Sequence, residues 1–401
     1  MMPGASGLGP KARVVGRYEL HAELASGGMG IVFIGRMSGL AGFGRTVAIK
    51  RLHPRFAREA EFATRFIDEA RLASRIHHPN VIQTCDVVVE DHEIFIVMEY
   101  VEGESLAKLL ELAPAHRLAP RTACAILENV LIGLHAVHEA RDERAQLLEI
   151  VHRDISPQNI LVGVDGQARI LDFGGAKGLG RSFVTRDGSI RGKFAYMAPE
   201  LLGGVASRAT DIYAAGVVLW ECLSGEPFLQ GSSEAARFAE ALLPRPRRLS
   251  RSLPEVSEAL DEVLLCALHP DPACRFVDAR AMAIALGNAV PRASTAEVTH
   301  LVSSLAPAPL ARRAALVAAA ERSSTSMTLS TTRSPARESS TTKRGTSART
   351  VSTTRSKLRP RSLWIIGASA LLLCAAILAL AVAAGVGRRR PSTRPQSAGH
   401  R

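Results

Sequence analysis

The spacing of apolar residues along the chain predicts several kinds of element. Between residues 59 and 76, apolar side chains recur every three or four positions, which predicts an amphipathic helix with one buried face. Residues 212–220 are almost wholly apolar and predict a fully buried helix. Residues 24–33 place several glycines between two apolar, strand-like runs, and this pattern predicts a flexible hairpin. Since the 401 residues also supply ample material for a core, wholesale disorder is excluded.

The longest stretch without a charged side chain is residues 363–387, which are mostly apolar. As a helix it would be about 37 Å long, enough to cross a hydrocarbon core of ~30 Å. Trp364 stands at one end, where interfacial aromatic residues are common. The alternative is a buried core helix, but basic residues crowd both ends of the stretch. We therefore expect one transmembrane helix.

The segment before this helix has a different composition. Residues 323–356 contain 20 serines and threonines in 34 positions, interleaved with arginine. Such a segment buries too little surface to offset its ordering entropy, so we expect disorder. Alanine-rich residues 310–321 predict at most a transient helix. The expected organisation is a flexible tail 1–17, a folded domain 18–288, a basic and mostly disordered linker 289–362, a transmembrane helix 363–387 and a basic tail 388–401.

The formal net charge of +12 is distributed unevenly. Residues 1–288 carry a net charge of −3, whereas residues 289–361 carry +10 and residues 388–401 carry +5. A folded part that is net negative and poor in aromatic residues excludes a nucleic-acid-binding surface. The N-terminus has no apolar signal segment, and seven basic residues precede the predicted helix within 343–361 against five after it. We therefore expect the N-terminal part to lie in the cytoplasm.

Two charged residues stand where the hydrophobic pattern expects apolar ones. Lys50 closes the apolar run 47–49 in a chain with only 7 lysines to 43 arginines. Glu69 lies on the apolar face of the predicted helix 59–76, where a carboxylate is costly without a cation. Lys50 is the candidate partner, although a glutamate at the edge of that face can also reach solvent. The six cysteines show no C-x-x-C spacing, which favours reduced thiols over a metal site.

Three further motifs follow in order: His-Arg-Asp-Ile-Ser-Pro-Gln-Asn at 152–159, Asp-Phe-Gly at 172–174 and Ala-Pro-Glu at 198–200. With the glycine-rich hairpin, Lys50 and Glu69, they make the chain resemble a protein kinase of the eukaryotic-like (Hanks) type. The chain is similar to membrane-anchored bacterial kinases of the myxobacterial kind in three features: the predicted membrane helix, the scarcity of lysine and the sequence of the loop 152–159. The resemblance covers residues 18–288 and implies an α+β, bilobal kinase fold with a small β-rich lobe and a larger helical lobe.

The resemblance also implies ATP and Mg²⁺ as cofactors and protein hydroxyls as substrates. Asp154 would accept or orient the substrate hydroxyl proton, while Lys50, held by Glu69, would engage the α- and β-phosphates. The oxygens of Asn159 and Asp172 would hold Mg²⁺. The residues that would surround the nucleotide are Gly27, Gly28, Gly30, Val32, Ala48, Lys50, Glu99, Val101 and Leu161. Glu200 would pair with Arg275 in a structural role.

The chain departs from the family pattern at three positions. Ala25 replaces the first glycine of the hairpin, which we expect to tune nucleotide affinity at most. Ser156 stands where the family has a lysine near the γ-phosphate, and Lys193 stands where it has a threonine. We expect that the ammonium of Lys193 reaches toward Asp154 and the γ-phosphate, because the position of the charge matters more than the loop that delivers it. The alternative is a solvated Lys193 and impaired catalysis.

The resemblance favours an active serine/threonine kinase, located at the bacterial inner membrane by a single span and with its kinase domain in the cytoplasm. The alternative is a membrane-tethered pseudokinase that binds nucleotide or partners only. A homodimer that phosphorylates itself in trans is a further hypothesis, with Thr185 or Ser189 as candidate sites. Phosphorylation of the linker would weaken its attraction to anionic lipid, unless the linker is a passive tether.

Overall fold

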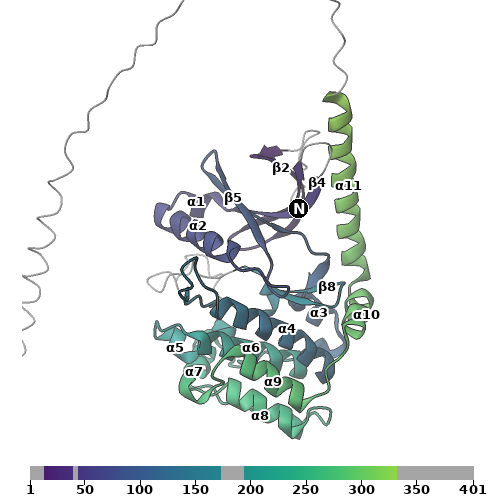
Figure 1. Ribbon diagram of the computed structural model, residues 1–401. Coiled ribbons are helices and arrows are strands. Elements are labelled where there is room, and N and C mark those ends of the chain that lie inside the picture. Colours follow the sequence, from purple (N-terminus) through teal and green to yellow (C-terminus); the bar gives the residue numbers. More distant parts are fainter. Residues whose placement is uncertain (1–12, 39–43, 173–193, 332–401) are drawn as a thin grey trace, which may run out of the picture. The chain divides into compact units, whose positions relative to one another are not determined.

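The computed structural model describes residues 13–38, 44–172 and 194–331 (Figure 1). The described residues form a lobe built on an antiparallel sheet and a second lobe that is mainly helical, as the kinase resemblance implies. The connection between the lobes runs from the end of one strand at Glu99 to the start of the next at Gly103.

The sheet lobe has six strands in the order β1-β2-β3-β4-β6-β5, and each neighbouring pair is antiparallel. Two helices, α1 (Pro54–Ala57) and α2 (Ala60–Ser74), lie between β4 and β5 in sequence. The strands are β1 (Arg13–Val15), β2 (Tyr18–Ser26), β3 (Gly30–Ser38), β4 (Gly44–Leu52), β5 (Thr84–Glu90) and β6 (Glu93–Glu99).

The glycine-rich hairpin predicted in residues 24–33 joins β2 to β3. The turn is closed by the amide of Gly27, which donates to the carbonyl oxygen of Gly30 at 2.9 Å. A side chain at Gly30 would place its Cβ 2.3 Å from the carbonyl oxygen of Arg51, so only glycine allows β3 to approach β4 this closely. The hairpin prediction is therefore confirmed, and the close approach of β3 to β4 explains the glycine at position 30.

Helix α2 confirms the helix predicted in residues 59–76. Phe66, Ala70 and Ala73 are buried, and Phe66 and Ala70 pack in one hydrophobic cluster with residues of β4 and β6. The 3.6-residue period thus identified the correct face. Burial of this face fixes α2 against the sheet and brings the side of the helix that carries Glu69 to the cavity described below.

The helical lobe begins with a small three-stranded sheet in the order β7-β8-β9 and continues with helices. The strands are β7 (Gly103–Ser105), β8 (Ile160–Gly163) and β9 (Ala168–Ile170). The helices are α3 (Leu106–Leu112), α4 (Pro120–His138), α5 (Pro199–Leu202), α6 (Arg208–Ser224), α7 (Glu234–Leu242), α8 (Glu258–Ala267), α9 (Ala279–Ala289), α10 (Thr295–Leu305) and α11 (Pro307–Thr331).

Helix α6 is the buried helix predicted in residues 212–220, and every residue of that run is buried. Its neighbours in the core include α4, α8 and α9. The helix begins at a capping box formed by Ser207 and Thr210 and ends at Gly225, whose φ of 75° is the left-handed conformation that favours glycine. Asp211, in its first turn, is fully buried and lies under the loop that carries the predicted catalytic residues.

The expectation of a mostly disordered linker from residue 289 onward differs from the structure. Residues 295–331 form α10 and α11, and α10 buries Val298 and Val302 in the core of the helical lobe. The alanines of α11 are mostly exposed and give the helix no strong periodic pattern, which explains why the sequence predicted only a transient helix. The C-terminal part of the predicted linker lies outside the described residues.

Other predictions also fall outside the described residues: the transmembrane helix 363–387, the tail 388–401, Lys193, Thr185 and Ser189. Among the described residues, no helix combines the length and apolar character needed to cross a membrane.

Candidate active site

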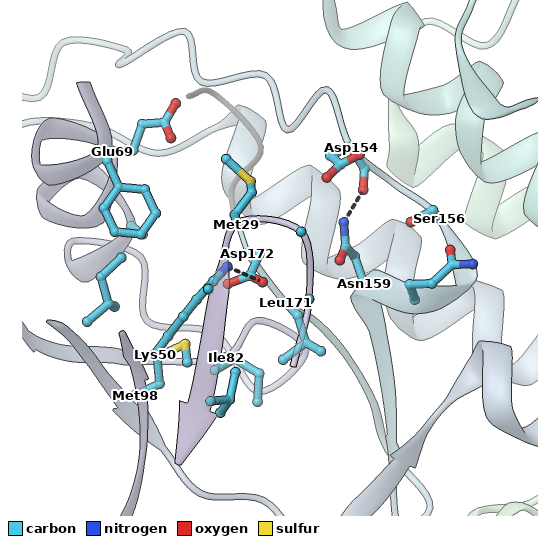
Figure 2. A pocket seen from close by; sticks show the side chains of 18 of the residues that line it. Met29, Lys50, Glu69, Ile82, Met98, Asp154, Ser156, Asn159, Leu171 and Asp172 are labelled. Carbon is cyan, nitrogen blue, oxygen red and sulfur yellow. Dashed lines mark hydrogen bonds and ion pairs between the residues drawn. The ribbon is translucent and has the colours of Figure 1, made fainter. Parts of the chain in front are cut away.

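A cavity of about 590 Å³ lies where the glycine-rich hairpin, helix α2 and the loop 152–159 converge (Figure 2). Its lining includes Gly27, Gly28 and Gly30 from the hairpin and Val32 from β3. The predicted residues that it brings together from the rest of the chain are Lys50, Glu69, Asp154, Ser156, Asn159 and Asp172. Segments far apart in sequence therefore deliver the motif residues to one place.

Lys50 is buried on β4, and its ammonium forms an ion pair with Asp172. The Nζ atom donates to Oδ2 of Asp172 at 2.7 Å. Lys50 is only 9% exposed, so its charge needs a close anion. Asp172 reaches it from a left-handed backbone conformation with φ of 47°, which costs about 1–3 kcal/mol in a non-glycine residue and persists only where the surroundings impose it.

The expected pairing of Lys50 with Glu69 is therefore not the one that the structure contains. Both residues line the cavity, but Figure 2 shows the carboxylate of Glu69 turned away from the Lys50 ammonium, which points toward Asp172. The physical reason is that the ammonium of a buried lysine can pair with the carboxylate of either Glu69 or Asp172. The spacing of residues in sequence does not set the distance between α2 and β4. Lys50 was correctly predicted to need an anionic partner, and the predicted partner was wrong for this conformation.

The loop 152–159 places Asp154 beside Asn159. The Nδ2 atom of Asn159 donates to the backbone carbonyl oxygen of Asp154 at 2.8 Å, and the amide of Leu171 donates to the Asn159 carbonyl oxygen at 2.9 Å. The second bond ties the loop to the segment that leads into Asp172. Asp154, Asn159 and Asp172 are thus held in a fixed order around the cavity by backbone contacts.

Asp211 holds this loop from below. Its carboxylate accepts hydrogen bonds from the backbone amides of His152 and Arg153, both at 2.7 Å, and from Nε2 of His138 at 2.8 Å. Burial by itself raises the pKa of this carboxyl. The hydrogen bond and charge of His138, together with the charge of His152 and the backbone amide of Arg153, outweigh burial and leave the pKa of Asp211 below its ordinary value. The ionised form of Asp211 is the one that fits this set of donors.

Asn159 and Asp172 carry the oxygen donors that suit Mg²⁺. Because the Nδ2 atom of Asn159 is directed to the Asp154 carbonyl, the amide oxygen remains for a ligand in the cavity. The second donor is the carboxylate of Asp172, whose side chain is 36% exposed. Hard oxygen ligands of this kind fit a magnesium ion that completes its shell with water and phosphate. No cluster of three or more histidine, cysteine, aspartate or glutamate side chains able to hold a metal occurs among the described residues.

Four of the residues predicted to surround adenine pack together next to the cavity. Val32, Ala48, Val101 and Leu161 belong to a single hydrophobic cluster that also contains Met98. Val32 and Met98 line the cavity directly, whereas Ala48, Glu99, Val101 and Leu161 are not part of its lining. The cluster can thus supply an apolar slot for a flat ring next to the connection between the lobes.

The ion pair predicted between Glu200 and Arg275 is confirmed. Both guanidinium nitrogens of Arg275 donate to the Glu200 carboxylate, at 2.7 and 2.9 Å. This bidentate geometry anchors the Ala-Pro-Glu segment to the helical lobe. Ser156 is 8% exposed and lines the cavity. Because Lys193 lies outside the described residues, the exchange of roles between Ser156 and Lys193 stays a prediction.

Sequence reasoning missed two residues near the site. His138 ends α4 and contacts Asp211 across 73 positions of sequence, and it is fully buried. Met98 ends the apolar run of β6 and lines the cavity. An apolar strand predicts burial but does not tell which of its residues meets a ligand. The position of His138 has no local signal at all.

The sequence matches the family of the protein kinase domain over residues 18–284. The tyrosine-protein kinase MasK of Myxococcus xanthus is 39% identical over 287 residues, which are 70% of this chain and 44% of that protein. The serine/threonine-protein kinase PrkC of Bacillus subtilis is 35% identical over 67% of this chain and 40% of that protein. The chain thus spans less than half the length of these two relatives.

A solved structure gives the same picture. The crystal structure of the Mycobacterium tuberculosis PknI kinase domain is 27% identical and superposes with a TM-score of 0.54. The superposition covers 72% of this chain and 100% of the solved chain. The serine/threonine-protein kinase PknL of the same organism is 35% identical over 66% of this chain and 64% of that protein.

Proposed function

Because the chain belongs to the protein kinase family, we propose that it transfers the γ-phosphate of ATP to serine and threonine hydroxyls of proteins, itself included. One observation carries the proposal: a single cavity brings together the glycine-rich hairpin, Lys50, Asp154, Asn159 and Asp172. Phosphoryl transfer requires positioned charge more than covalent chemistry, and these residues supply it.

Each residue has a role that its position supports. Asp154, held by the loop that Asp211 anchors, accepts the proton of the attacking hydroxyl. Asn159 and Asp172 hold Mg²⁺, which neutralises phosphate charge when it is bound. Lys50 binds the α- and β-phosphates after exchanging Asp172 for Glu69, which lines the same cavity. The backbone of Gly27, Gly28 and Gly30 covers the phosphates.

The adenine ring would lie between Val32, Ala48 and Leu161. The backbone of Glu99 and Val101 would hydrogen-bond its polar edge. The exchange of Ser156 and Lys193 belongs to the same proposal: the Lys193 ammonium would stabilise the transferred phosphate and Ser156 would supply a hydroxyl. Adding Ser156→Lys to a Lys193→Thr variant would then recover much of the activity that the single change removes.

The experiment uses the full chain with labelled ATP, with Mg²⁺ or with EDTA, followed by phosphoamino-acid analysis. We expect phosphoserine and phosphothreonine that depend on Mg²⁺. Phosphotyrosine alone would favour the activity named for the Myxococcus xanthus relative. Nucleotide binding with no label in any residue would favour a pseudokinase scaffold instead. Ser156 and Lys193, which depart from the family pattern, are the features that the pseudokinase alternative rests on.

The proposal places the protein in the bacterial inner membrane through residues 363–387, with the kinase domain in the cytoplasm. The support is the uncharged stretch itself and the basic residues on both sides of it. Protease digestion of intact spheroplasts tests this topology: the kinase domain should be protected until the membrane is permeabilised. Association through this span would also favour a homodimer that phosphorylates itself in trans.

A further inference from the structure

Helix α11 extends from the helical lobe along the sheet lobe (Figure 1). It begins where α10 ends, and both are anchored in the helical lobe: Val298, Val302 and Leu310 are buried in the core of that lobe. The turn before α10 is also fixed, because the amide of Ala293 donates to the carbonyl oxygen of Arg121 at 3.1 Å. The start of α11 is thus held by the core of the helical lobe.

At the connection between the lobes, α11 contributes one cation. Arg313 donates to the backbone carbonyl oxygen of Gly103 and, through Nη2, to Oε1 of Glu104 at 2.8 Å. Glu104 is only 4% exposed, and the same carboxylate oxygen accepts the amide of Ser105 at 2.8 Å. A buried carboxylate requires a partner of opposite charge. Arg313 therefore neutralises Glu104 at the start of β7, immediately after the connecting residues 100–102.

Further along, α11 contacts the strands that carry the nucleotide-binding residues. Oε1 of Glu321 accepts a hydrogen bond from Nη1 of Arg36 on β3 at 3.2 Å and lies 3.5 Å from Oγ1 of Thr46 on β4. Ala320 is 2% exposed, so α11 packs against the sheet lobe at this point. β3 begins at Gly30 of the hairpin, and β4 carries Ala48 and Lys50.

We propose that α11 is a positioning element of the nucleotide site, with Arg313 as the residue that holds β7 in place. The inference rests on the proposed function, because it assumes that residues 99–101 bind adenine. Loss of Arg313 leaves the Glu104 carboxylate buried without its cation, so β7 moves or opens to water and the adjoining connection loses its shape. The functional kinase unit of this chain then extends to about residue 323, well past the 284 at which the family match ends.

Arg313→Gln in the full chain is the test, and Arg312→Gln is its matched control. Arg312 is the preceding residue, carries the same charge and is exposed. Two quantities are measured for each variant: hydrogen exchange of the amides in residues 99–105 without nucleotide, and the dissociation constant of Mg·ADP by calorimetry. We expect Arg313→Gln to speed that exchange and to weaken Mg·ADP binding by about tenfold, as for the loss of a charge-assisted hydrogen bond. Arg312→Gln should leave both at their wild-type values.

A second change separates positioning from general stability. Glu104→Gln added to Arg313→Gln removes the unpaired buried charge, so exchange in residues 99–105 and Mg·ADP affinity should return most of the way to the wild type. Glu321→Gln, at the far end of the helix, should weaken binding about twofold and serves if Arg313→Gln does not fold. Exchange and affinity that are equal in Arg313→Gln and Arg312→Gln would overturn the inference. A wild type that binds Mg·ADP but transfers no phosphate would overturn the proposed function and leave this inference standing.

Discussion

Two aspartates serve neighbouring parts of the site in opposite ways. Asp211 is fully buried and accepts hydrogen bonds from two backbone amides and His138, so all its partners belong to the scaffold. Asp172 is about one third exposed, has a left-handed φ and forms an ion pair with a single side chain, the buried Lys50. Asp211 is thus part of a rigid support beneath the loop 152–159, whereas the ion pair of Asp172 with Lys50 is an exchangeable contact. Such a contact can break when metal and nucleotide bind.

The largest effect on stability should come from Asp211. Asp211→Ala leaves the amides of His152 and Arg153 without an acceptor and His138 without its partner. We expect the free energy of unfolding to fall by about 3–5 kcal/mol, as for a broken buried network. Urea denaturation measures it. A loss below about 1 kcal/mol would mean that Asp211 is not the anchor of the loop.

Asp172→Ala should show the opposite pattern. Loss of the carboxylate that we propose to hold Mg²⁺ should lower the rate of phosphate transfer by about 10²–10³-fold. The free energy of unfolding should change by about 1 kcal/mol, because the Asp172 side chain is partly exposed and Glu69, in the same cavity, offers Lys50 another carboxylate. Transfer assays and urea denaturation of the same variant measure the two effects. If Asp172→Ala lowered the free energy of unfolding as much as Asp211→Ala does, the contrast between a rigid support and an exchangeable contact would fail.

The buried support beneath the loop 152–159 should also make the stability of the fold depend on pH. Burial lowers the pKa of His152 below its ordinary 6.5, so the unfolded chain takes up a proton first and stability is lost as the pH falls below about 6.5. The lowered pKa of Asp211 acts at lower pH: its contribution is present above 3.8 and is lost as the pH falls through the folded-state pKa.

Each group can contribute a slope of up to about 1.4 kcal/mol per pH unit. Urea denaturation between pH 7 and pH 4 measures the contribution of His152, with His152→Gln as the comparison. The variant should show a flatter profile just below pH 6.5. An identical slope in both proteins would exclude His152 as the source.

The smallest effect should come from Glu69. If Lys50 exchanges Asp172 for Glu69 during turnover, Glu69→Gln should lower the rate of transfer by about tenfold, or roughly 1.4 kcal/mol. Asp68→Asn is the control, since Asp68 is exposed on the same helix and pairs only loosely with Arg71 at 3.4 Å. Equal rates in the two variants would show that Lys50 does not need Glu69.

The site residues that lie in one continuous motif could be predicted from the sequence. The loop 152–159 contains Asp154 and Asn159 within six positions, so its backbone path fixes their relation. The partner of Lys50 was not readable, because Glu69 and Asp172 both supply a carboxylate and only the placement of α2 decides between them. His138 contacts Asp211 through tertiary packing alone.

The fold shows the same limit. The helix in residues 59–76 and the buried helix in 212–220 have strong patterns and were predicted correctly. Helices α10 and α11 fall in a segment for which the sequence predicted a mostly disordered linker, with at most a transient helix at 310–321. Their stability comes from contacts such as Arg313 with Glu104, which join residues 209 positions apart. Local propensity contains no information about such contacts.

The most direct test of the proposed kinase activity is single-turnover transfer of labelled γ-phosphate by the full chain, comparing Asp154→Asn with Asp165→Asn. Asp165 is a control carboxylate in the β8–β9 turn, where it pairs with Arg169 at 2.5 Å. With Mg·ADP affinity unchanged in both variants, we predict that Asp154→Asn lowers the rate by at least about 10²-fold and that Asp165→Asn leaves it within about twofold. Equal transfer rates in the two variants, at equal nucleotide affinity, would contradict the assignment of Asp154 as the catalytic base.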